Sequence, residues 1–359
     1  MNWTVKTLHT SEPDFALWKN YYSRLEQKGI YHSPEYIRCL EKHYQDEAEL
    51  FVFGNEKEYL YYPYFRRRLD KLPFSENCAI NLSDHFDIIS SWYYGGPLPS
   101  NSRLNKLIFK EFIQVFSDFS RQERFVSEFI RFDPYLQNHS NFTELLPVSK
   151  NRESIYVDLR LPEDRIWVNM EGRARTAIRK AKKLGVKVYV SDDINDVTHF
   201  YKIYNAEMER KMAPGHYLFS QEFIMDLFKT LGSKIALICA IIDDVIISGG
   251  VFVCEAGEAA HYYLMATDQN YIRYQANNLI LHEAIRYFKK KKLKIFDFQG
   301  GREGVYKFKK SFSKNRISFF TCGIIHNLPI TKKLVDYKNA HSSGLKDAFF
   351  PEYRIKNTN

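Results

Sequence analysis

The organisation of this chain is clearest in two stretches, GRARTAIRKAKKLGVKV from Gly172 to Val188 and FDFQGGREGVYKFKKSF from Phe296 to Phe312. The first is typical of an amphipathic helix that runs into a strand. The second predicts a buried strand, a Gly-Gly turn and a basic segment that carries the pair Phe308-Lys309. Neither stretch contains a metal-ligand, nucleotide-binding or catalytic-triad motif.

Working outward, the two halves of the chain repeat one order of elements. The first half predicts helices 12–28 and 33–44, strands 48–53 and 58–65, the segment IISSWYYGGPLPS (88–100), a helix 103–120 and a strand 125–132. The second half predicts helices 173–184, 194–211 and 220–231, strands 235–242, 245–254 and 259–266, a helix 276–290 and a strand 294–298. Matching SWYYGGPLPS-helix-FVSEFIRF to AHYYLMATD-helix-LKIFDFQG indicates a duplicated α/β unit with mixed sheets.

The length of 359 residues fits two domains of ordinary size. We expect an N-terminal domain over residues 1–150, a C-terminal domain over 151–340 and a C-terminal tail over 341–359. The connecting segment 142–159 is predicted to form two strands, 143–148 and 154–159, because it lacks the Gly/Ser composition of a flexible linker.

Composition narrows the class of protein. Net charge is +9, from 52 Lys and Arg against 43 Asp and Glu, which favours partners that carry phosphate or an anionic surface. Five scattered cysteines and eleven histidines show no metal-ligand spacing, so we expect no metal and read the histidines as incidental. The start has no apolar signal core, and the most apolar region, 235–254, is interrupted by Asp243-Asp244. A cytoplasmic protein is expected, with peripheral contact to the inner membrane as a further expectation.

The basic stretch 172–184 is a candidate anion-binding helix. A step of 100° per residue places Ala174, Ala177, Ile178, Ala181 and Leu184 on one side and directs Arg175, Arg179, Lys182 and Lys183 away from it, with Arg173 and Lys180 flanking. Arg binds phosphate through two parallel hydrogen bonds, and no Glu stands at i+4 to neutralise these cations. A solvated amphipathic helix explains the same pattern.

Acyl transfer to an amine passes through an oxyanion, and a fixed cation aimed at it would stabilise that charge. Lys309 is our candidate for this cation, although Lys307 and Lys310 are close and a phosphate-binding loop is an alternative. Asp297 alternates with Phe296 and Phe298, so it is a second candidate; the alternative is that it holds the Gly-Gly turn. Asp268, which follows the predicted strand 259–266, would serve as a base or cap the next loop.

Further candidates would contact the substrate. Tyr93, Tyr94, Gly95 and Gly96 lie at the matching point of the first half, where tyrosines stack on a sugar or a base and glycines admit a close ligand; a tight turn explains the glycines equally. Asn277 begins the helix 276–290, whose free N–H groups suit an anion. Tyr263 and Phe308 complete the substrate-binding candidates.

These motifs, in this order, resemble the FemAB-type transferases and the broader BioF2-like acetyltransferase group. The matching segments are RARTAIRKAKKLGVKV, YYGGPL, FIRFDPY, the helix 277–288 before FDFQGG, and GVYKFKKSF. The resemblance implies a tandem of two GNAT (acyl-CoA N-acyltransferase-like) domains, anion contacts by Arg175, Arg179 and Lys180, and a Phe-Lys pair beside the transferred carbonyl. Two features depart from it: no long helical hairpin follows Val190, and Arg273–Asn278 contains no glycine of an acetyl-CoA loop.

The resemblance implies an acyltransferase that forms an amide between an aminoacyl or acyl donor and an amino group of a cell-envelope glycan or peptidoglycan precursor. One alternative is an acetyl-CoA-dependent N-acetyltransferase for a nucleotide-linked amino sugar, and another is a non-catalytic module that binds tRNA or a glycan lipid. No permanently bound cofactor is expected, and aminoacyl-tRNA or acyl-CoA would be the co-substrate. The expected partners are a nucleotide- or lipid-linked amino-sugar or peptide precursor and tRNA, but not DNA.

Overall fold

The computed structural model describes residues 3–78, 80–341 and 350–354, and the chain divides into two compact units. The first unit comprises residues 1–151 and 319–359, and the second comprises residues 152–318. The chain passes from one unit to the other within β7 (Val148–Asp158) and returns within β13 (Asn315–Ile325). Of the expected tail, residues 342–349 and 355–359 lie outside the described part.

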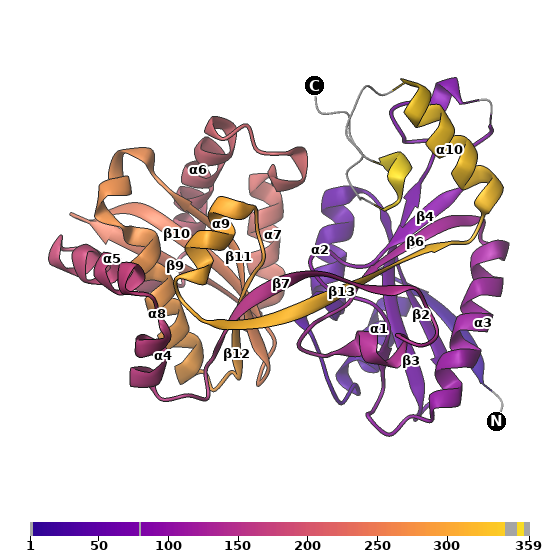
Figure 1. Cartoon of the computed structure of the whole chain (residues 1–359), viewed down its shortest axis with the longest axis horizontal. Helices are drawn as coiled ribbons and strands as arrows, with labels where there is room; N and C mark the ends of the chain where they lie inside the picture. The colour runs from indigo at the N-terminus through magenta and orange to yellow at the C-terminus, as the bar shows by residue number, and fades with distance from the viewer. Residues whose placement is uncertain (1–2, 79, 342–349, 355–359) are drawn as a thin grey trace. The chain divides into compact units, whose positions relative to one another are not determined.

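The first unit is built on a sheet of strand order β1-β2-β3-β4-β6-β13, with β5 beside β3 (Figure 1). Only β4 and β6 run parallel among these pairs. Its elements are β1 (Thr4–His9), α1 (Asp14–Ser23), α2 (Pro34–Tyr44), β2 (Glu47–Gly54), β3 (Tyr59–Arg68), β4 (Phe86–Ile89), β5 (Leu98–Pro99), α3 (Lys106–Gln122), β6 (Phe125–Arg131) and α10 (Leu328–His341), with 3-10 turns η1 (Ile30–His32), η2 (Ser75–Asn77), η3 (Asn138–Asn141) and η7 (Glu352–Arg354).

The second unit is built on a sheet of strand order β7-β12-β11-β10-β9-β8, in which β11 and β12 form the parallel pair. Its elements after β7 are α4 (Glu163–Asn169), α5 (Gly172–Lys183), β8 (Lys187–Ser191), α6 (Ile194–Arg210), α7 (Gln221–Leu231), β9 (Ile235–Ile242), β10 (Val245–Cys254), β11 (Ala259–Thr267), α8 (Ala276–Lys290), β12 (Ile295–Gln299) and α9 (Glu303–Lys310), with 3-10 turns η4 (Gly215–Tyr217), η5 (Gly232–Lys234) and η6 (Gln269–Tyr274).

The expected duplication is confirmed. Each unit runs strand, two helices, a three-strand meander, a helix and a strand parallel to the end of the meander, and each sheet is completed by one more antiparallel strand. In the first unit that strand is β13, from late in the chain, and in the second it is β7, from before α4. Helices α4 and α5 are additions of the second unit.

The match of SWYYGGPLPS to AHYYLMATD and the strand predicted over 143–148 were wrong. The counterpart of β11 is β4, residues 86–89, so SWYYGG is the loop after that strand. Residues 143–146 form a turn, and the strand begins at Val148, because Leu145 and Leu146 both bond back to the carbonyl of Phe142. In the second unit β9, β10 and α8 have the predicted bounds.

The core of the second unit follows from alternation along its strands. Ala236, Ile238 and Ala240 of β9 pack in one cluster with α5 and α8, whose buried residues include Ile178 and Leu281. The opposite face of the sheet meets α6 so closely that a Cβ on Gly249 would lie 2.5 Å from the Phe200 ring. The sheet therefore has both faces covered, as its nearly continuous apolar strands indicate.

The core of the first unit is aromatic. Phe51, Tyr62, Phe112, Phe116 and Phe125 pack together at ring separations typical of edge-to-face and offset pairs. Ser33 is the N-cap of α2, because Ser33 Oγ accepts from the Tyr36 N–H at 3.3 Å and Pro34 occupies the first helical position. Within residues 3–78, 80–341 and 350–354, no helix combines the length and apolar character needed to cross a bilayer.

Candidate active site

The parallel strands of the second unit part soon after they begin to pair. Their ladder covers three residue pairs and ends where His261 of β11 faces Asp297 of β12. Just beyond, β11 carries an extra residue at Tyr263 opposite β10, and β12 shifts register against β7 before Gln299, whose φ is +61°. Bulges of this kind re-aim side chains and end pairing, so this point is an opening in the sheet.

A buried His-Asp pair lies at this opening. His261 Nδ1 and Asp297 Oδ2 are 3.0 Å apart, and the two residues are 3% and 0% exposed. The other carboxylate oxygen, Asp297 Oδ1, accepts from the Gln299 N–H at 2.7 Å. A carboxylate so far from water needs such partners, and Asp297 has them.

Lys309 lies in the same place. It belongs to the last turn of α9, is 4% exposed, and donates from Nζ to the carbonyl of Gly300 at 2.9 Å. Its Nζ also lies 4.2 Å from the centre of the Tyr262 ring. Burial lowers the pKa of Lys309 from its ordinary value to about 8, and the charge of Asp297 opposes that fall. The structure thus brings Lys309 close enough to Asp297 for their charges to interact, and His261 pairs with the same carboxylate.

Lys307 and Lys310, the other lysines of this segment, are exposed. Lys309 therefore differs from them by its burial, which the sequence does not reveal. The Phe308 ring packs on Phe312 at 5.5 Å, beside the core cluster, so its described contacts are those of a packing residue. Tyr263 is 2% exposed and stacks on Phe219 at 6.4 Å on the α6 face of the sheet.

Asp268 and Asn277 stand at the carboxyl end of β11. Asp268 is half-buried and accepts from the Asn270 N–H at 2.9 Å, which makes it the N-cap of η6. Asn277 Oδ1 accepts from Ser248 Oγ at 2.7 Å and from Thr267 Oγ1 at 2.6 Å, so this amide joins the start of α8 to β10 and β11. Both residues hold the loop that follows β11.

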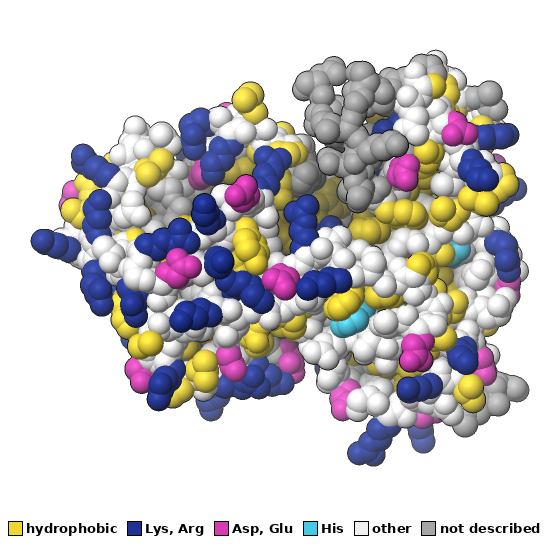
Figure 2. Space-filling view, in the orientation of Figure 1, with side chains coloured by type: hydrophobic (Ala, Val, Ile, Leu, Met, Phe, Trp, Pro, Cys, Tyr) yellow, Lys and Arg dark blue, Asp and Glu magenta, His cyan; other side chains and the backbone are white. Residues whose placement is uncertain are grey.

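The cationic helix α5 lies on the surface of the second unit. Ala174, Ile178 and Ala181 are buried as predicted, but Leu184 is 41% exposed because the helix ends at Lys183. The predicted lack of acidic partners is only partly right: Arg173 pairs with Glu171 at 2.7 Å, and Lys182 pairs with Glu283 of α8 at 3.3 Å. Figure 2 shows Lys and Arg side chains gathered where Figure 1 places α5.

Three candidate cations of α5 differ in their surroundings. Arg179 is exposed, and its guanidinium lies 5.4 Å from the centre of the Trp167 ring of α4. Lys180 is exposed as well, whereas Arg175 is half-buried. No carboxylate among the described residues lies within ion-pairing distance of Arg175, Arg179 or Lys180, so these three candidates are left for an anion, as is Lys183 at the end of the helix.

The segment from Tyr93 to Gly96 lies in the first unit. Gly95 donates its N–H to the Arg131 carbonyl at 2.7 Å, and its carbonyl accepts from Asn138 Nδ2 at 2.9 Å. A Cβ on Gly95 would lie 2.7 Å from Ser90, and one on Gly96, at φ +86°, would lie 2.9 Å from Ile130. Close packing thus explains both glycines. Tyr94 is buried and Tyr93 is half-buried against Trp92.

His261 is the site residue that sequence reasoning missed. The reading of the histidines as incidental is wrong for this one, because it pairs with Asp297 inside the sheet. A signal was present: His261 and Asp297 are each the third residue of strands that flank one helix, and such strands are parallel neighbours. Among the described residues, no group of three or more His, Cys, Asp or Glu side chains is placed to hold a metal ion.

Comparison with protein families identifies the segment that carries this site. Residues 169–310 match the family model described as acetyltransferase (GNAT) domain. That range contains α5, the β11–β12 opening and Lys309, and it leaves the first unit unmatched. No curated protein sequence gives a significant match to the chain.

Solved structures share the fold over almost the whole chain. The crystal structure of FemX has a TM-score of 0.68 at 13% identity and covers 91% of this chain and 99% of its own. The C-terminal domain of a putative lysylphosphatidylglycerol synthetase from Agrobacterium fabrum has a TM-score of 0.55 at 12% identity, covering 92% and 98%. L-PGS from Bacillus licheniformis has a TM-score of 0.54 at 11% identity, covering 90% and 95%. The predicted tandem GNAT fold is thereby confirmed.

Proposed function

We propose that this chain, a FemAB-like acyltransferase of the GNAT superfamily, joins an aminoacyl or acyl group to an amino group of a cell-envelope glycan or peptidoglycan precursor. The observation that carries the proposal is the burial of Lys309 beside Asp297, at the point where β11 and β12 part. Burying a lysine with one carboxylate nearby lowers the stability of the fold. Ionisable groups buried in this way cluster at functional sites.

In the proposed reaction, the acceptor amine attacks the carbonyl carbon of the activated acyl group. The carbonyl π electrons move to oxygen, and the ammonium group of Lys309 stabilises the oxyanion. The tetrahedral intermediate collapses, the amide remains, and the leaving group departs as the thiol of coenzyme A or the ribose hydroxyl of a tRNA. The proton lost by the amine balances the one that the leaving group takes up.

We assign the two carboxylates of the site different roles. Asp297 is fully buried and bonded to His261 and the Gln299 N–H, so it would hold Lys309 in its charged form. Asp268 is half-buried at the carboxyl end of β11, and it is the better candidate for accepting the proton of the amine. Asn277 and Tyr263 would line the part of the site that binds the aminoacyl or acyl donor.

The cations left unpaired on α5 would hold phosphate. Arg175, Arg179 and Lys180 suit the pyrophosphate of a nucleotide or lipid carrier, or the backbone of tRNA, because each presents N–H donors without a carboxylate partner. In the first unit, Tyr93 and Tyr94, shaped by Gly95 and Gly96, remain our candidates for contact with the acceptor. Phe308 would fix the position of Lys309 through its packing on Phe312.

Two donors are supported by different findings. The match of residues 169–310 to an acetyltransferase (GNAT) domain favours acyl-CoA. Similarity to a structure named as a lysylphosphatidylglycerol synthetase favours an aminoacyl donor, and that name also supports a lipid-linked acceptor. We place the aminoacyl donor first because that similarity covers 92% of this chain, whereas the family model leaves the first unit unmatched.

The test is direct. Purified protein would be incubated with acetyl-CoA or with charged tRNA, together with UDP-linked amino sugars and peptide-bearing precursors, and the added mass would be read by mass spectrometry. We expect an aminoacyl increment on an amine, lost in Lys309→Met and kept in Lys310→Met. An acetyl increment on a nucleotide-linked amino sugar would instead select the acetyltransferase. No product with any donor, while affinity for tRNA or precursor persists, would make the chain a binding module.

A further inference from the structure

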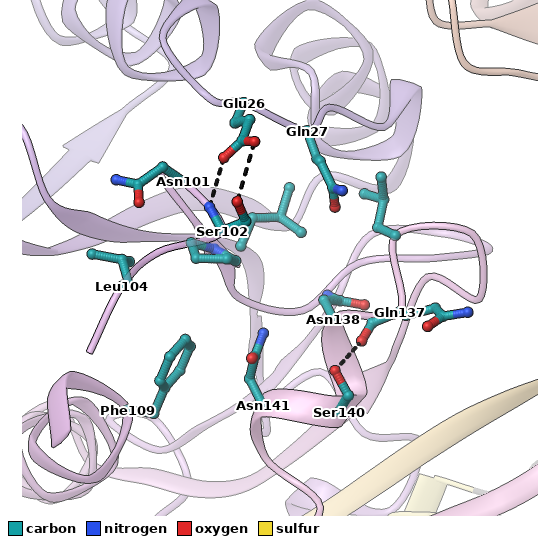
Figure 3. Close-up of a pocket in the computed structure, with 13 residues that line it drawn as sticks. Glu26, Gln27, Asn101, Ser102, Leu104, Phe109, Gln137, Asn138, Ser140 and Asn141 are labelled. Carbon is teal, nitrogen blue, oxygen red and sulfur yellow. Dashed lines mark hydrogen bonds between the residues drawn. The ribbon is translucent and has the colours of Figure 1, made fainter. Parts of the chain in front are cut away.

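The first unit contains a hollow that the proposed chemistry does not use. Its volume is about 240 Å³, and it lies between three loops (Figure 3). These segments are Glu26–Gln27 after α1, residues 98–104, which comprise β5 and the turn after it, and residues 136–141 after β6, with Phe109 of α3 behind them. The last of them follows the carboxyl end of β6, which is parallel to β4, and ligands bind at the carboxyl ends of the strands in an α/β sheet.

The walls of the hollow are fixed by hydrogen bonds among the loops. The Glu26 carboxylate accepts from the Ser102 N–H at 2.6 Å and from Ser102 Oγ at 3.2 Å, and these bonds lower the pKa of Glu26. The Asn138 side chain accepts from the Asp133 N–H at 2.9 Å and donates to the Gly95 carbonyl at 2.9 Å. A binding site formed in advance in this way loses little conformational entropy when it binds.

The side chains of three carboxamides of the hollow, Gln27, Gln137 and Asn141, exchange no hydrogen bond with another described residue. Figure 3 shows the side chains of Gln27 and Asn141 directed into the space between the loops, from opposite sides. Neither side chain exchanges a hydrogen bond with another described residue, whereas the amides of Asn101 and Asn138 are engaged at Arg103 and Gly95. Each free carboxamide offers two donors and one acceptor with two lone pairs.

The charge of the hollow excludes an anion. No Lys or Arg is among its lining residues, although the whole chain carries a net charge of +9. Its one carboxylate, Glu26, is occupied by Ser102. Leu98, Leu104, Phe109 and Leu136 add apolar contact at the back and side. Opposed carboxamides over an apolar wall match a pyranose ring, whose hydroxyls both donate and accept and whose C–H face is apolar.

We propose that this hollow is a binding site for a neutral hexose or N-acetylhexosamine, held between Gln27 and Asn141. The size agrees, because a hollow of about 240 Å³ lies below the roughly 300–1,000 Å³ of pockets that take drug-sized ligands, which favours a single sugar ring. The inference goes beyond the proposed acyl transfer and requires binding alone, so it stands or falls separately from the chemistry at Lys309.

The experiment uses the full chain and measures binding of free N-acetylglucosamine and glucose by saturation-transfer NMR and titration calorimetry, with glycylglycine and inorganic phosphate as competing probes. We expect saturable sugar binding, about tenfold weaker in Asn141→Leu and about threefold weaker in Gln27→Ala. Gln122→Ala, an exposed carboxamide at the end of α3 outside the hollow, should bind the sugar as the parent does.

Binding in Lys309→Met should also be unchanged, which separates this site from the proposed chemistry. Each variant would first be checked by thermal melting, and Asn141→Ser would replace Asn141→Leu if the latter failed to fold. The proposal is overturned if no sugar binds at millimolar concentration, if binding is undiminished in both variants of the hollow, or if the dipeptide or phosphate binds there in place of the sugar.

Discussion

The two units share one order of strands but differ at their parallel pair. In the second unit β11 and β12 pair over three residues and then separate around His261, Asp297 and Lys309. In the first unit the matching strands β4 and β6 stay together beyond their ends. Ser90 N–H bonds to the Phe129 carbonyl at 3.0 Å, and Gly95 N–H bonds to the Arg131 carbonyl at 2.7 Å.

The buried carboxylates of the two units make the same contrast. Glu128 of β6 accepts from Tyr62 OH at 2.6 Å and lies 2.9 Å from His326 Nε2, in a site without a lysine. Asp297 of β12 has a histidine as well, but its charge also acts on a buried lysine at an opening in the sheet. In the first unit the parallel strands stay paired and the buried carboxylate of Glu128 has its hydrogen-bond partners. In the second unit the parallel strands separate and the buried cation Lys309 lies at the opening. This difference is the reason why we propose the chemistry in the second unit.

The largest effect expected of any substitution is that of Lys309→Met, which keeps the stem of the side chain and removes its charge. If Lys309 stabilises the oxyanion, kcat should fall about 100- to 1,000-fold, the loss typical of one oxyanion donor. Steady-state kinetics with the active donor would measure it. Lys310→Met is the matched control, since Lys310 is the exposed neighbour on α9. A loss of less than about tenfold would remove Lys309 from the mechanism and with it the contrast between the units.

The next largest effect is expected at Gly96, in the loop that follows β4 in the first unit. Gly96→Ala should lower the free energy of unfolding by about 2–4 kcal/mol, because the residue has φ +86° and the new Cβ would lie 2.9 Å from Ile130. Gly185→Ala in the second unit is the control: φ is +83° there, and nothing lies within 4 Å of the added Cβ. That substitution should cost about 1 kcal/mol, the backbone contribution alone.

Chemical denaturation measures both costs, and kinetics on the folded fraction shows whether function follows. Because we propose that this turn shapes the contact with the acceptor, we expect a raised acceptor KM with kcat unchanged in folded Gly96→Ala. An unchanged acceptor KM in the folded variant would remove the turn from substrate binding and leave Gly96 a packing residue.

The third effect is a shift in pH dependence. The pKa of Lys309 is about 8, so a cationic role predicts that kcat falls as pH rises through that value. Asp297 raises the pKa of Lys309, so Asp297→Asn should move the descent to lower pH. A displacement of one pKa unit would reduce kcat at pH 8 roughly fivefold, because the protonated fraction of Lys309 would fall from about one half to about one tenth. Glu128→Gln is the control from the first unit and should leave the profile in place. An unshifted pH profile in Asp297→Asn would show that the charge of Asp297 does not set the pKa on which kcat depends.

The order and type of elements could be predicted because their patterns are local. β9, β10 and α8 were placed to the residue by apolar runs that end at turn residues such as Asp243-Asp244. The sequence did not predict that β7 pairs with β12 of the second unit and that β13 pairs with β6 of the first, because the pattern of a strand does not specify its pairing partner. The position of β4 was missed because the four residues 86–89 give too short a pattern beside SWYYGG.

The candidate site was partly predictable for a similar reason. Lys309 and Asp297 were singled out by their motifs, but the burial that distinguishes Lys309 from Lys307 and Lys310 depends on tertiary packing over Tyr262. His261 lies 36 residues from Asp297 in the chain, so only the parallel register of β11 and β12 unites them. The hollow of the first unit was not predicted, since Gln27 and Asn141, which we propose to hold the sugar, come from loops far apart in sequence.

The smallest effect expected is at the surface helix α5. Arg179→Glu should raise the KM for an anionic substrate about three- to tenfold with kcat unchanged, because an exposed cation contributes about 1 kcal/mol and is screened by salt. The rise should shrink as ionic strength increases. Lys187→Glu on β8 makes the same change of charge at another exposed position of this unit and should have little effect. Equal rises in KM in the two variants would show that the net charge of the protein, and not Arg179, attracts the anionic substrate. The first unit, which has no counterpart of α5, would then attract that substrate as well as the second.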